Sequence, residues 1–244
     1  MSDHGRPSRS PSRRGLLGAC AVAATAGLAG CASGSLDAET SVTREYDGDE
    51  LTELAVETTS GEIDIREEHR EKVRVEATKR AADDEALDDI RLREDRVDES
   101  LSLTVDSDSG LLSFGSAPRM DLVIAVPDGL TIRAETTDSD IDIGARTAER
   151  ISADTTNGDI ALSVATPSDI RANTTNGDVS ITLPATGEPS VSFETTTGEF
   201  DAGGFDTGSI EADSGVDRTI GNGTHRIRVE TTNGDLTVRG ERMS

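Results

Sequence analysis

Residues 155–162 have the sequence Thr-Thr-Asn-Gly-Asp-Ile-Ala-Leu, and almost the same sequence returns at 174–181 as Thr-Thr-Asn-Gly-Asp-Val-Ser-Ile. The polar start is followed by alternating apolar residues, which predicts a β-strand with one buried face. Related copies begin at Thr58, Thr136, Thr195 and Thr231. From Thr136 onward the copies start 19, 19, 21 and 36 residues apart. The phrase is therefore an internal repeat with a period near 19 residues.

Each copy combines two strands with a turn between them. Ile151 and Ala153 alternate with polar residues before the turn, and Ile160 and Leu162 do so after it. Asn-Gly tolerates a positive φ and predicts a tight bend. The expected turn residues are Gly61, Asn157, Gly158, Asp159, Asn176, Gly177, Asp178, Asn233, Gly234 and Asp235.

Two folds compete for this pattern. An Asn-Gly turn between strands is typical of an antiparallel hairpin, but a meander of hairpins would need alternate turns to differ. A constant period with equivalent segments favours a single-stranded parallel β-solenoid, a β-helix-like stack in which each ~19-residue rung lies on the preceding one. We therefore expect an all-β fold of this kind. Residues 210–216 resemble a degenerate copy and would form a further rung inside the 36-residue gap.

The two threonines of each copy have different expected positions. One threonine follows the apolar alternation inward and would form a ladder of β-branched side chains whose hydroxyls bond near the bend. The inward set is Thr58, Thr136, Thr155, Thr174, Thr195 and Thr231, and the outward set is Thr59, Thr137, Thr156, Thr175, Thr196 and Thr232. The whole phrase then has a structural role that needs no ligand.

The segment between the first two copies is less regular. Residues 71–77 and 100–105 alternate as strands, and residues 81–90 are acidic, which predicts a short helix. Residues 120–126 are almost continuously apolar and end at Pro127-Asp128-Gly129. This pattern indicates a buried strand followed by a turn.

The N-terminus carries the pattern of an export signal. Residues 1–12 are polar, and Arg13 and Arg14 then directly precede an apolar run, which is typical of a twin-arginine signal. The run from Gly15 to Gly30 is shorter than the roughly 20 residues that a membrane-spanning helix needs. We therefore expect residues 1–30 to be a signal peptide that takes no part in the fold.

Cys31 follows Leu28-Ala29-Gly30, and this order resembles a lipobox, in which the cysteine thiol takes a lipid. The alternative is an ordinary cleaved signal with a chance cysteine. Cys20 would leave with the signal, so no internal disulfide is expected. Lipidation would make residues 31–44 a modified cysteine with a polar tether and residues 45–240 the repeat domain. The protein would then be extracytoplasmic and held at the cell membrane through the lipid.

The composition limits the partners. The chain has 48 acidic and 24 basic residues, a net charge of -24, and 2% aromatic residues. Phosphates would be repelled, which argues against binding nucleic acid and against charge-driven attachment to anionic lipids. Only Lys72 and Lys79 are lysines. This acidic, lysine-poor composition resembles that of haloarchaeal surface proteins, and an acidic surface protein of a mesophile is the alternative.

The order of the segments resembles the DUF4097 family. The resemblance rests on five segments in this order: an early Ser-Gly-Glu-Ile strand, a Lys/Arg-Val strand, a charged stretch, Leu-Val-Ile-Ala-Val-Pro-Asp-Gly at 122–129 and the repeated rungs. It covers residues 45–240. Members are described as β-strand-repeat proteins and adhesin-like. The resemblance implies a β-solenoid-like fold at the cell envelope and supplies no catalytic residues.

These patterns favour a binding or structural module of the envelope over an enzyme. His69 and His225 have unrelated contexts, with His225 expected in a solvated loop, and the sequence has no nucleophile elbow, zincin motif or phosphate-binding loop. We expect no cofactor, no metal and no catalytic residue, and a surface protein or a glycan as partner. Two alternatives are open. One is Ca²⁺ held between stacked Asn-Gly-Asp turns, and the other is a β-helix enzyme that acts on a polysaccharide.

Overall fold

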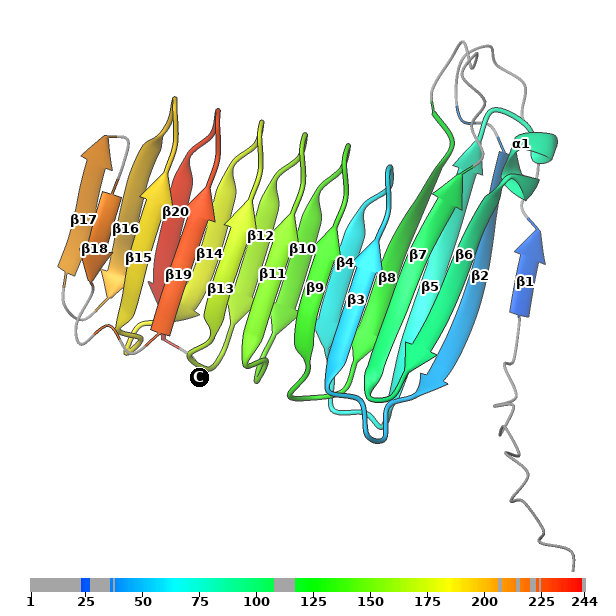
Figure 1. Cartoon of the computed structure of the whole chain (residues 1–244), viewed down its shortest axis with the longest axis horizontal. Coiled ribbons are helices and arrows are strands. Elements are labelled where there is room, and N and C mark those ends of the chain that lie inside the picture. The colour runs from blue at the N-terminus through cyan, green and yellow to red at the C-terminus, as the bar shows by residue number, and fades with distance from the viewer. Residues whose placement is uncertain are drawn as a thin grey trace, which may run out of the picture.

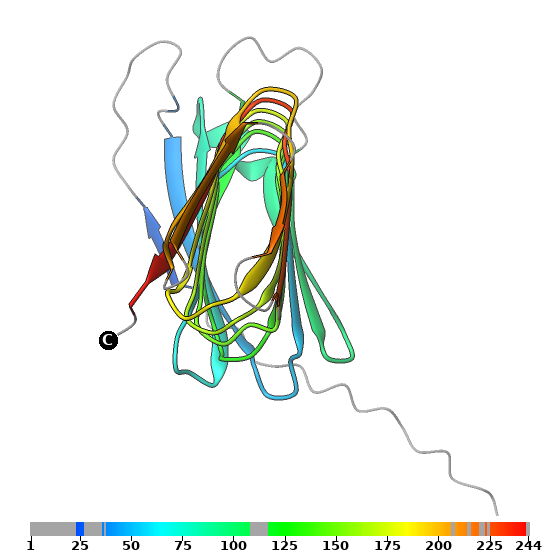
Figure 2. The ribbon, with the colours of Figure 1, turned by 90° about the vertical axis from the view of Figure 1, so that its left-hand side faces the viewer.

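Two β-sheets lie face to face in the computed structural model and form an elongated stack (Figures 1 and 2). The structure describes residues 23–26, 36, 38–107, 117–205, 208–213, 216–219, 223 and 225–242. Within these ranges sheet A contains, in spatial order, β1 (Ala23–Ala26), β2 (Ala38–Asp47), β5 (Lys72–Ala81), β8 (Arg119–Val126), β4 (Ile63–Glu67), β10 (Ile141–Ala145), β12 (Ile160–Val164), β14 (Val179–Pro184), β20 (Leu236–Glu241), β16 (Glu199–Phe205) and β17 (Gly208–Asp213). Sheet B contains β18 (Val216–Thr219), β15 (Pro189–Glu194), β19 (His225–Glu230), β13 (Asp169–Asn173), β11 (Arg150–Asp154), β9 (Thr131–Glu135), β3 (Glu53–Glu57), β7 (Ser100–Ser107) and β6 (Ile90–Val97).

A rung consists of one strand of sheet B, a turn and the next strand of sheet A. The rungs that carry the repeated phrase are β3–β4, β9–β10, β11–β12, β13–β14, β15–β16 and β19–β20. Neighbouring rungs pair in parallel and in register, with Ile141 opposite Ile160 and Ile160 opposite Val179. The two strands of one rung belong to different sheets, so the turn does not close a hairpin. The expected parallel pairing is confirmed, and the hairpin meander is excluded for these rungs.

The rungs do not stack in the order of the sequence. β4 lies between β8 and β10, and β3 lies between β7 and β9, so the first rung is inside the stack and not at its end. At the other end β20 lies between β14 and β16, and β19 lies between β13 and β15. The expectation of a single stack in which each rung lies on the preceding one is therefore wrong at both ends. The sequence of each copy determines its own strand alternation and turn. Because the copies are nearly identical, the repeated sequence does not determine which rung pairs with which.

Antiparallel strands cover the two ends of the stack (Figure 1). β17 pairs antiparallel with β16, and β18 pairs antiparallel with β15. Residues 210–213 and 216 lie in these strands, so the expected further rung at 210–216 is not formed. At the opposite end β5 pairs antiparallel with β8 and with β2, and β6 pairs with β7. An open parallel rung would present unpaired N–H and C=O groups, and the antiparallel strands occupy them.

The alternation seen in the sequence becomes the core between the two sheets. β-branched and leucine side chains dominate it because they fit a pleated surface. Buried core residues come from sheet A, for example Ile63, Ile141, Ile160, Val179 and Leu236, and from sheet B, for example Leu54, Ile132, Ile151, Ile170 and Ile227. Near β15 and β16 the core is filled by Phe193 and Phe200, whose ring centroids are 6.3 Å apart.

The irregular segment contains the strands expected at 71–77, 100–105 and 120–126, which are β5, β7 and β8. The helix α1 (Asp84–Asp88) is shorter than the predicted helix at 81–90 because β5 runs to Ala81 and β6 begins at Ile90. Asp83 caps α1 by accepting the N–H of Ala86 at 2.9 Å.

Sheet A begins earlier in the chain than the sequence predicts. β2 starts at Ala38 and pairs with β5 along its whole length, so residues 38–44 lie in the sheet and not in a tether. β1 pairs antiparallel with β2, although its residues belong to the expected signal peptide. Arg13, Arg14 and Cys31 lie outside the described residues.

Candidate functional site

The asparagines of the repeated turns stack into a ladder along one edge of the molecule, where the turns line up in Figure 1. Nδ2 of Asn176 donates to Oδ1 of Asn157 at 2.9 Å, and Nδ2 of Asn233 donates to Oδ1 of Asn176 at 2.9 Å. Asn157 extends the ladder to Asp138 at 2.7 Å. Each amide can donate and accept at once, which explains why the phrase contains asparagine.

The aspartates of the same turns bind the backbone of the neighbouring rung. Oδ1 of Asp159 accepts the N–H of Asp178 at 2.8 Å, and Oδ1 of Asp178 accepts the N–H of Asp235 at 2.9 Å. Asp235 accepts the N–H of Glu199 at 2.8 Å. Neighbouring strands lie about 4.8 Å apart, so the carboxylates form a row of like charges. In the described part of the chain, no group of three or more His, Cys, Asp or Glu side chains is placed to hold a metal ion.

The glycine of each turn is required because the neighbouring rung approaches closely. A Cβ at Gly158 would lie 2.1 Å from the carbonyl oxygen of Ser139. A Cβ at Gly177 would lie 2.0 Å from the carbonyl oxygen of Gly158, and one at Gly234 would lie 1.8 Å from that of Gly177. Gly158 is not among the residues with a positive φ. The sequence suggested that these turns contain glycine because they need a positive φ. The three turns instead share the close approach of a carbonyl oxygen from the neighbouring rung.

The two rows of threonines lie as predicted. The inward residues Thr58, Thr136, Thr155, Thr174 and Thr231 are buried and Thr195 is half-buried, whereas all six outward residues are exposed. The hydroxyl of Thr155 donates to the carbonyl oxygen of Ser139 at 3.1 Å, and that of Thr174 donates to Gly158 at 3.1 Å. The buried hydroxyls of Thr136, Thr195 and Thr231 have no hydrogen-bond partner among the described residues. The expected bonding near the bend is thus made by part of the ladder only.

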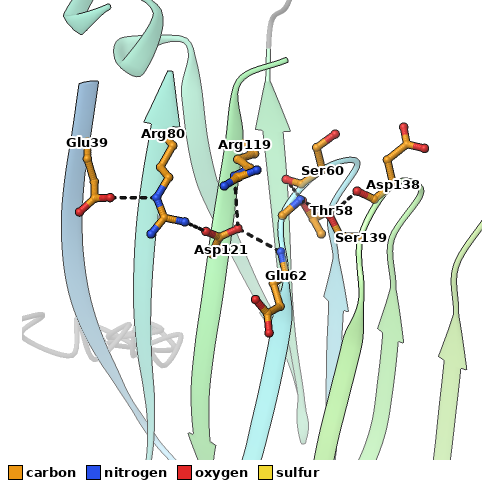
Figure 3. Close-up of polar contacts among 10 residues, drawn as sticks. Glu39, Thr58, Ser60, Glu62, Arg80, Arg119, Asp121, Asp138 and Ser139 are labelled. Atoms are coloured by element: carbon orange, nitrogen blue, oxygen red, sulfur yellow. Dashed lines mark hydrogen bonds and ion pairs between the residues drawn. The ribbon is translucent and has the colours of Figure 1, made fainter. Parts of the chain in front are cut away.

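Hydroxyl contacts replace the amide ladder where the first rung meets the second (Figure 3). Ser139 stands where other copies have glycine, and its Oγ accepts the N–H of Gly61 at 2.7 Å. The Thr58 hydroxyl donates to the carbonyl oxygen of Ser60 at 3.2 Å. A Cβ at Gly61 would lie 1.9 Å from the carbonyl oxygen of Met120, so this turn also needs glycine for close packing.

An ionic chain continues from this point across the end of sheet A (Figure 3). Asp121 accepts the N–H of Glu62 at 3.1 Å and forms an ion pair with Arg80. Arg80 also donates to Glu39 at 2.8 Å, and Arg119 lies 3.9 Å from Asp121. The chain links β4, β8, β5 and β2, so these charged residues hold the end of the sheet together.

His69 and His225, the histidines within the described residues, lie apart from each other. His69 is 95% exposed in its side chain and contacts Asp128 at 3.0 Å, which lowers the pKa of Asp128. The sequence predicted His225 in a solvated loop. This prediction is wrong, because His225 is half-buried at the start of β19.

Sequence reasoning missed a cluster of arginines on the outer face of sheet B. Arg150 on β11, Arg171 on β13, and Arg226 and Arg228 on β19 point away from the core and line a cavity of about 280 Å³. We call these four residues the arginine patch. Arg171 and Arg228 lie directly opposite each other in the parallel pairing. A signal was present, since arginine occupies outward positions before the turn in several copies.

A threonine-lined groove adjoins the arginine patch. It has a volume of about 430 Å³ and is lined by Thr155, Asn173, Thr174, Thr175, Glu194, Thr195, Thr196, Glu230, Thr231 and Thr232. Arg228 connects the two regions because its guanidinium contacts Glu230 at 2.7 Å and Glu194 at 3.2 Å. The hydrogen bond to Glu230, with the charge of Glu194 beside it, raises the pKa of Arg228.

The amino-acid sequence matches one family model over residues 42–239, described as Toastrack DUF4097. The chain belongs to the DUF4097 family. This assignment confirms the resemblance carried by the strand order and the repeated phrase. No curated protein matches the chain.

The comparison with solved structures finds matches of low sequence identity. One, described as a putative cell adhesion protein from Clostridium sporogenes ATCC 15579, superposes with a TM-score of 0.58 at 13% identity, and the match covers 83% of this chain and 100% of the other. Another, described as a putative adhesin from Bacteroides fragilis NCTC 9343, has a TM-score of 0.34 at 15% identity, with 81% and 96% covered. The first likeness shows that the DUF4097 fold is shared. Among the described residues, no helix is long and apolar enough to cross a membrane.

Proposed function

We propose that this DUF4097 protein is an exported, lipid-anchored binding module of the cell envelope and acts without catalysis. The name of its structural neighbour from Clostridium sporogenes, which refers to cell adhesion, supports an adhesin-like role at the cell surface. The order Arg13, Arg14, apolar run, Cys31 supports export in the folded state and attachment through a lipid on the cysteine.

One observation carries the binding role. The asparagine, aspartate and glycine of the repeated phrase have structural tasks: asparagine bonds asparagine, aspartate bonds the backbone, and glycine admits the next rung. The outer face of these rungs is available to a partner, because polar side chains form rows there and line open grooves. Such a surface suits non-covalent contact with an extended partner over several rungs.

Fractionation of cells that express the full chain tests the anchor. We expect wild-type protein in the membrane fraction and the variant Cys31→Ser in the soluble extracytoplasmic fraction. Cys20→Ser is the matched control, because this thiol lies in the signal and its loss should change nothing. Replacement of both export arginines, Arg13→Lys with Arg14→Lys, should leave the precursor inside the cell. Membrane retention of Cys31→Ser would contradict the lipid anchor.

A further inference from the structure

Four arginines stand together on a protein that has twice as many acidic as basic residues, 48 against 24. The arginine patch (Arg150, Arg171, Arg226 and Arg228) spans three neighbouring strands, β11, β13 and β19. β19 reaches this place only because the last rung is inserted beside β13. The fold therefore assembles the patch from segments that are far apart in the chain.

Two of the four guanidinium groups have no partner among the described residues. Arg228 is paired with Glu230 and Glu194, and Arg171 lies 3.6 Å from Glu230. The exposed side chains of Arg150 and Arg226 make no hydrogen bond or ion pair within the described residues. Asp169 also lines the cavity and lies opposite Arg150 in the pairing, and one oxygen of its carboxylate accepts the backbone N–H of Arg226 at 3.1 Å. Beside this one carboxylate the cavity presents two guanidinium groups that have no partner in the described part of the chain, each able to bind a carboxylate or sulfate through two hydrogen bonds.

The adjoining groove offers a different chemistry. Its outer lining includes the exposed hydroxyls of Thr175, Thr196 and Thr232 and the carboxylates of Glu194 and Glu230. Hydroxyls and carboxylates can exchange hydrogen bonds with the hydroxyl groups of a sugar. A DNA duplex has no free sugar hydroxyls along its chain, so this half of the surface favours a polysaccharide over DNA.

We propose that the outer face of sheet B binds an acidic polysaccharide. A carboxylate or sulfate group of the polymer occupies the cavity at Arg150 and Arg226, and neighbouring sugar hydroxyls lie in the threonine-lined groove. This inference rests on the proposed role as a binding module and names its ligand class.

Binding of the purified full-length protein to defined polymers tests the proposal. The probes are polygalacturonate, which carries carboxylates, dextran sulfate, which carries sulfates, uncharged dextran and a short DNA duplex. We expect one or both acidic polysaccharides to bind, and the uncharged dextran to bind at least about tenfold more weakly because it has no charged group for the arginines. The DNA duplex should also bind at least about tenfold more weakly, because it has no free sugar hydroxyls for the threonine-lined groove. The comparison of the first two probes identifies the anionic group.

Two double variants with the same change in charge locate the site. Arg150→Gln with Arg226→Gln should weaken binding of the acidic probe about tenfold or more, since it removes both free guanidinium groups. Arg91→Gln with Arg242→Gln removes two exposed arginines outside the patch, and binding should be unchanged. Each single patch variant repeats the test, and thermal unfolding checks that all variants are folded.

Three results would overturn the proposal. These are undiminished binding by the patch variant, equal binding of the DNA duplex, or no binding of either acidic polysaccharide. In each case the membrane fractionation of Cys31→Ser still decides the proposed function separately, because the anchor does not depend on the patch.

Discussion

Arg66 and Asp142 form a bidentate ion pair in which Nη1 donates to Oδ1 and Nη2 donates to Oδ2, both at 2.8 Å. The pair joins β4 of the inserted first rung to β10, across 76 residues of sequence. Gly144 lies opposite Arg66 in the pairing, and a Cβ there would be 3.1 Å from Cδ and Nη1 of Arg66. The absent side chain gives the guanidinium room to lie over β10. This contact helps to define the neighbour of the first rung, which the repeat leaves open.

Arg66→Lys should lower the free energy of unfolding by about 0.5–1 kcal/mol, because an ammonium group cannot form the bidentate pair and the pair is partly exposed. Urea denaturation measures the loss. Arg91→Lys makes the same substitution at an exposed arginine that has no ion pair within the described residues, and it should have no effect. A double-mutant cycle with Asp142→Asn that gives no coupling energy would show that the pair contributes nothing.

Asn176→Ala should destabilise the protein by about 1 kcal/mol, because it removes two side-chain hydrogen bonds from the middle of the amide ladder. Thr175→Ala is the control, since this exposed hydroxyl makes no hydrogen bond within the described residues. Chemical denaturation compares the two. Equal losses would mean that the ladder adds no stability beyond that of any exposed turn residue.

Gly158→Ala should cost about 3 kcal/mol, because the new Cβ meets a backbone carbonyl oxygen that cannot move without disturbing the next rung. Gly129→Ala separates this effect from backbone strain: its φ is +84°, and a Cβ there would have nothing within 4 Å. We expect about 1–2 kcal/mol for Gly129→Ala from the left-handed conformation alone. Thermal unfolding measures both. A larger loss for Gly129→Ala than for Gly158→Ala would show that a positive φ matters more than the close approach of the next rung.

The melting temperature should rise with NaCl concentration, because salt screens the net charge of -24 and the row of aspartates at the turns. CaCl₂ at the same ionic strength should raise it by the same amount. Asp178→Asn removes the charge but keeps an acceptor oxygen, so its melting temperature should depend less on salt. A further rise that is specific to CaCl₂ and reversed by a chelator would instead favour the Ca²⁺ alternative.

His69→Gln should raise the pKa of Asp128 toward its ordinary value of 3.8, because the hydrogen bond from His69 is the main cause of the lowered pKa. A carboxyl group with a lowered pKa stabilises the fold above its ordinary pKa, and this stabilisation is lost as the pH falls through the lowered value. The variant should therefore lose less stability on acidification below pH 3.8. NMR titration of Asp128 measures the pKa, and an unchanged value would contradict the assigned cause.

Local patterns predicted the turn residues and both threonine rows because these depend on a period of two within a few residues. The reason for the glycines could not be found in this way. At Gly158 the obstacle is the carbonyl oxygen of Ser139, which belongs to another rung. The arginine patch could not be predicted for a similar reason. Arg171 and Arg228 are far apart in the chain and become neighbours only through the pairing of β13 with β19.

The sequence by itself determined the parallel rungs, their buried faces and the residues of the turns. The tertiary structure alone decided the order of the rungs, the antiparallel strands at both ends and the surface on which the arginines meet. The physical reason is that alternation and turn chemistry act within one copy and are nearly the same in all. Neighbours are selected by contacts between copies, such as Arg66 with Asp142 and Asn233 with Asn176, whose partners are far apart in the chain.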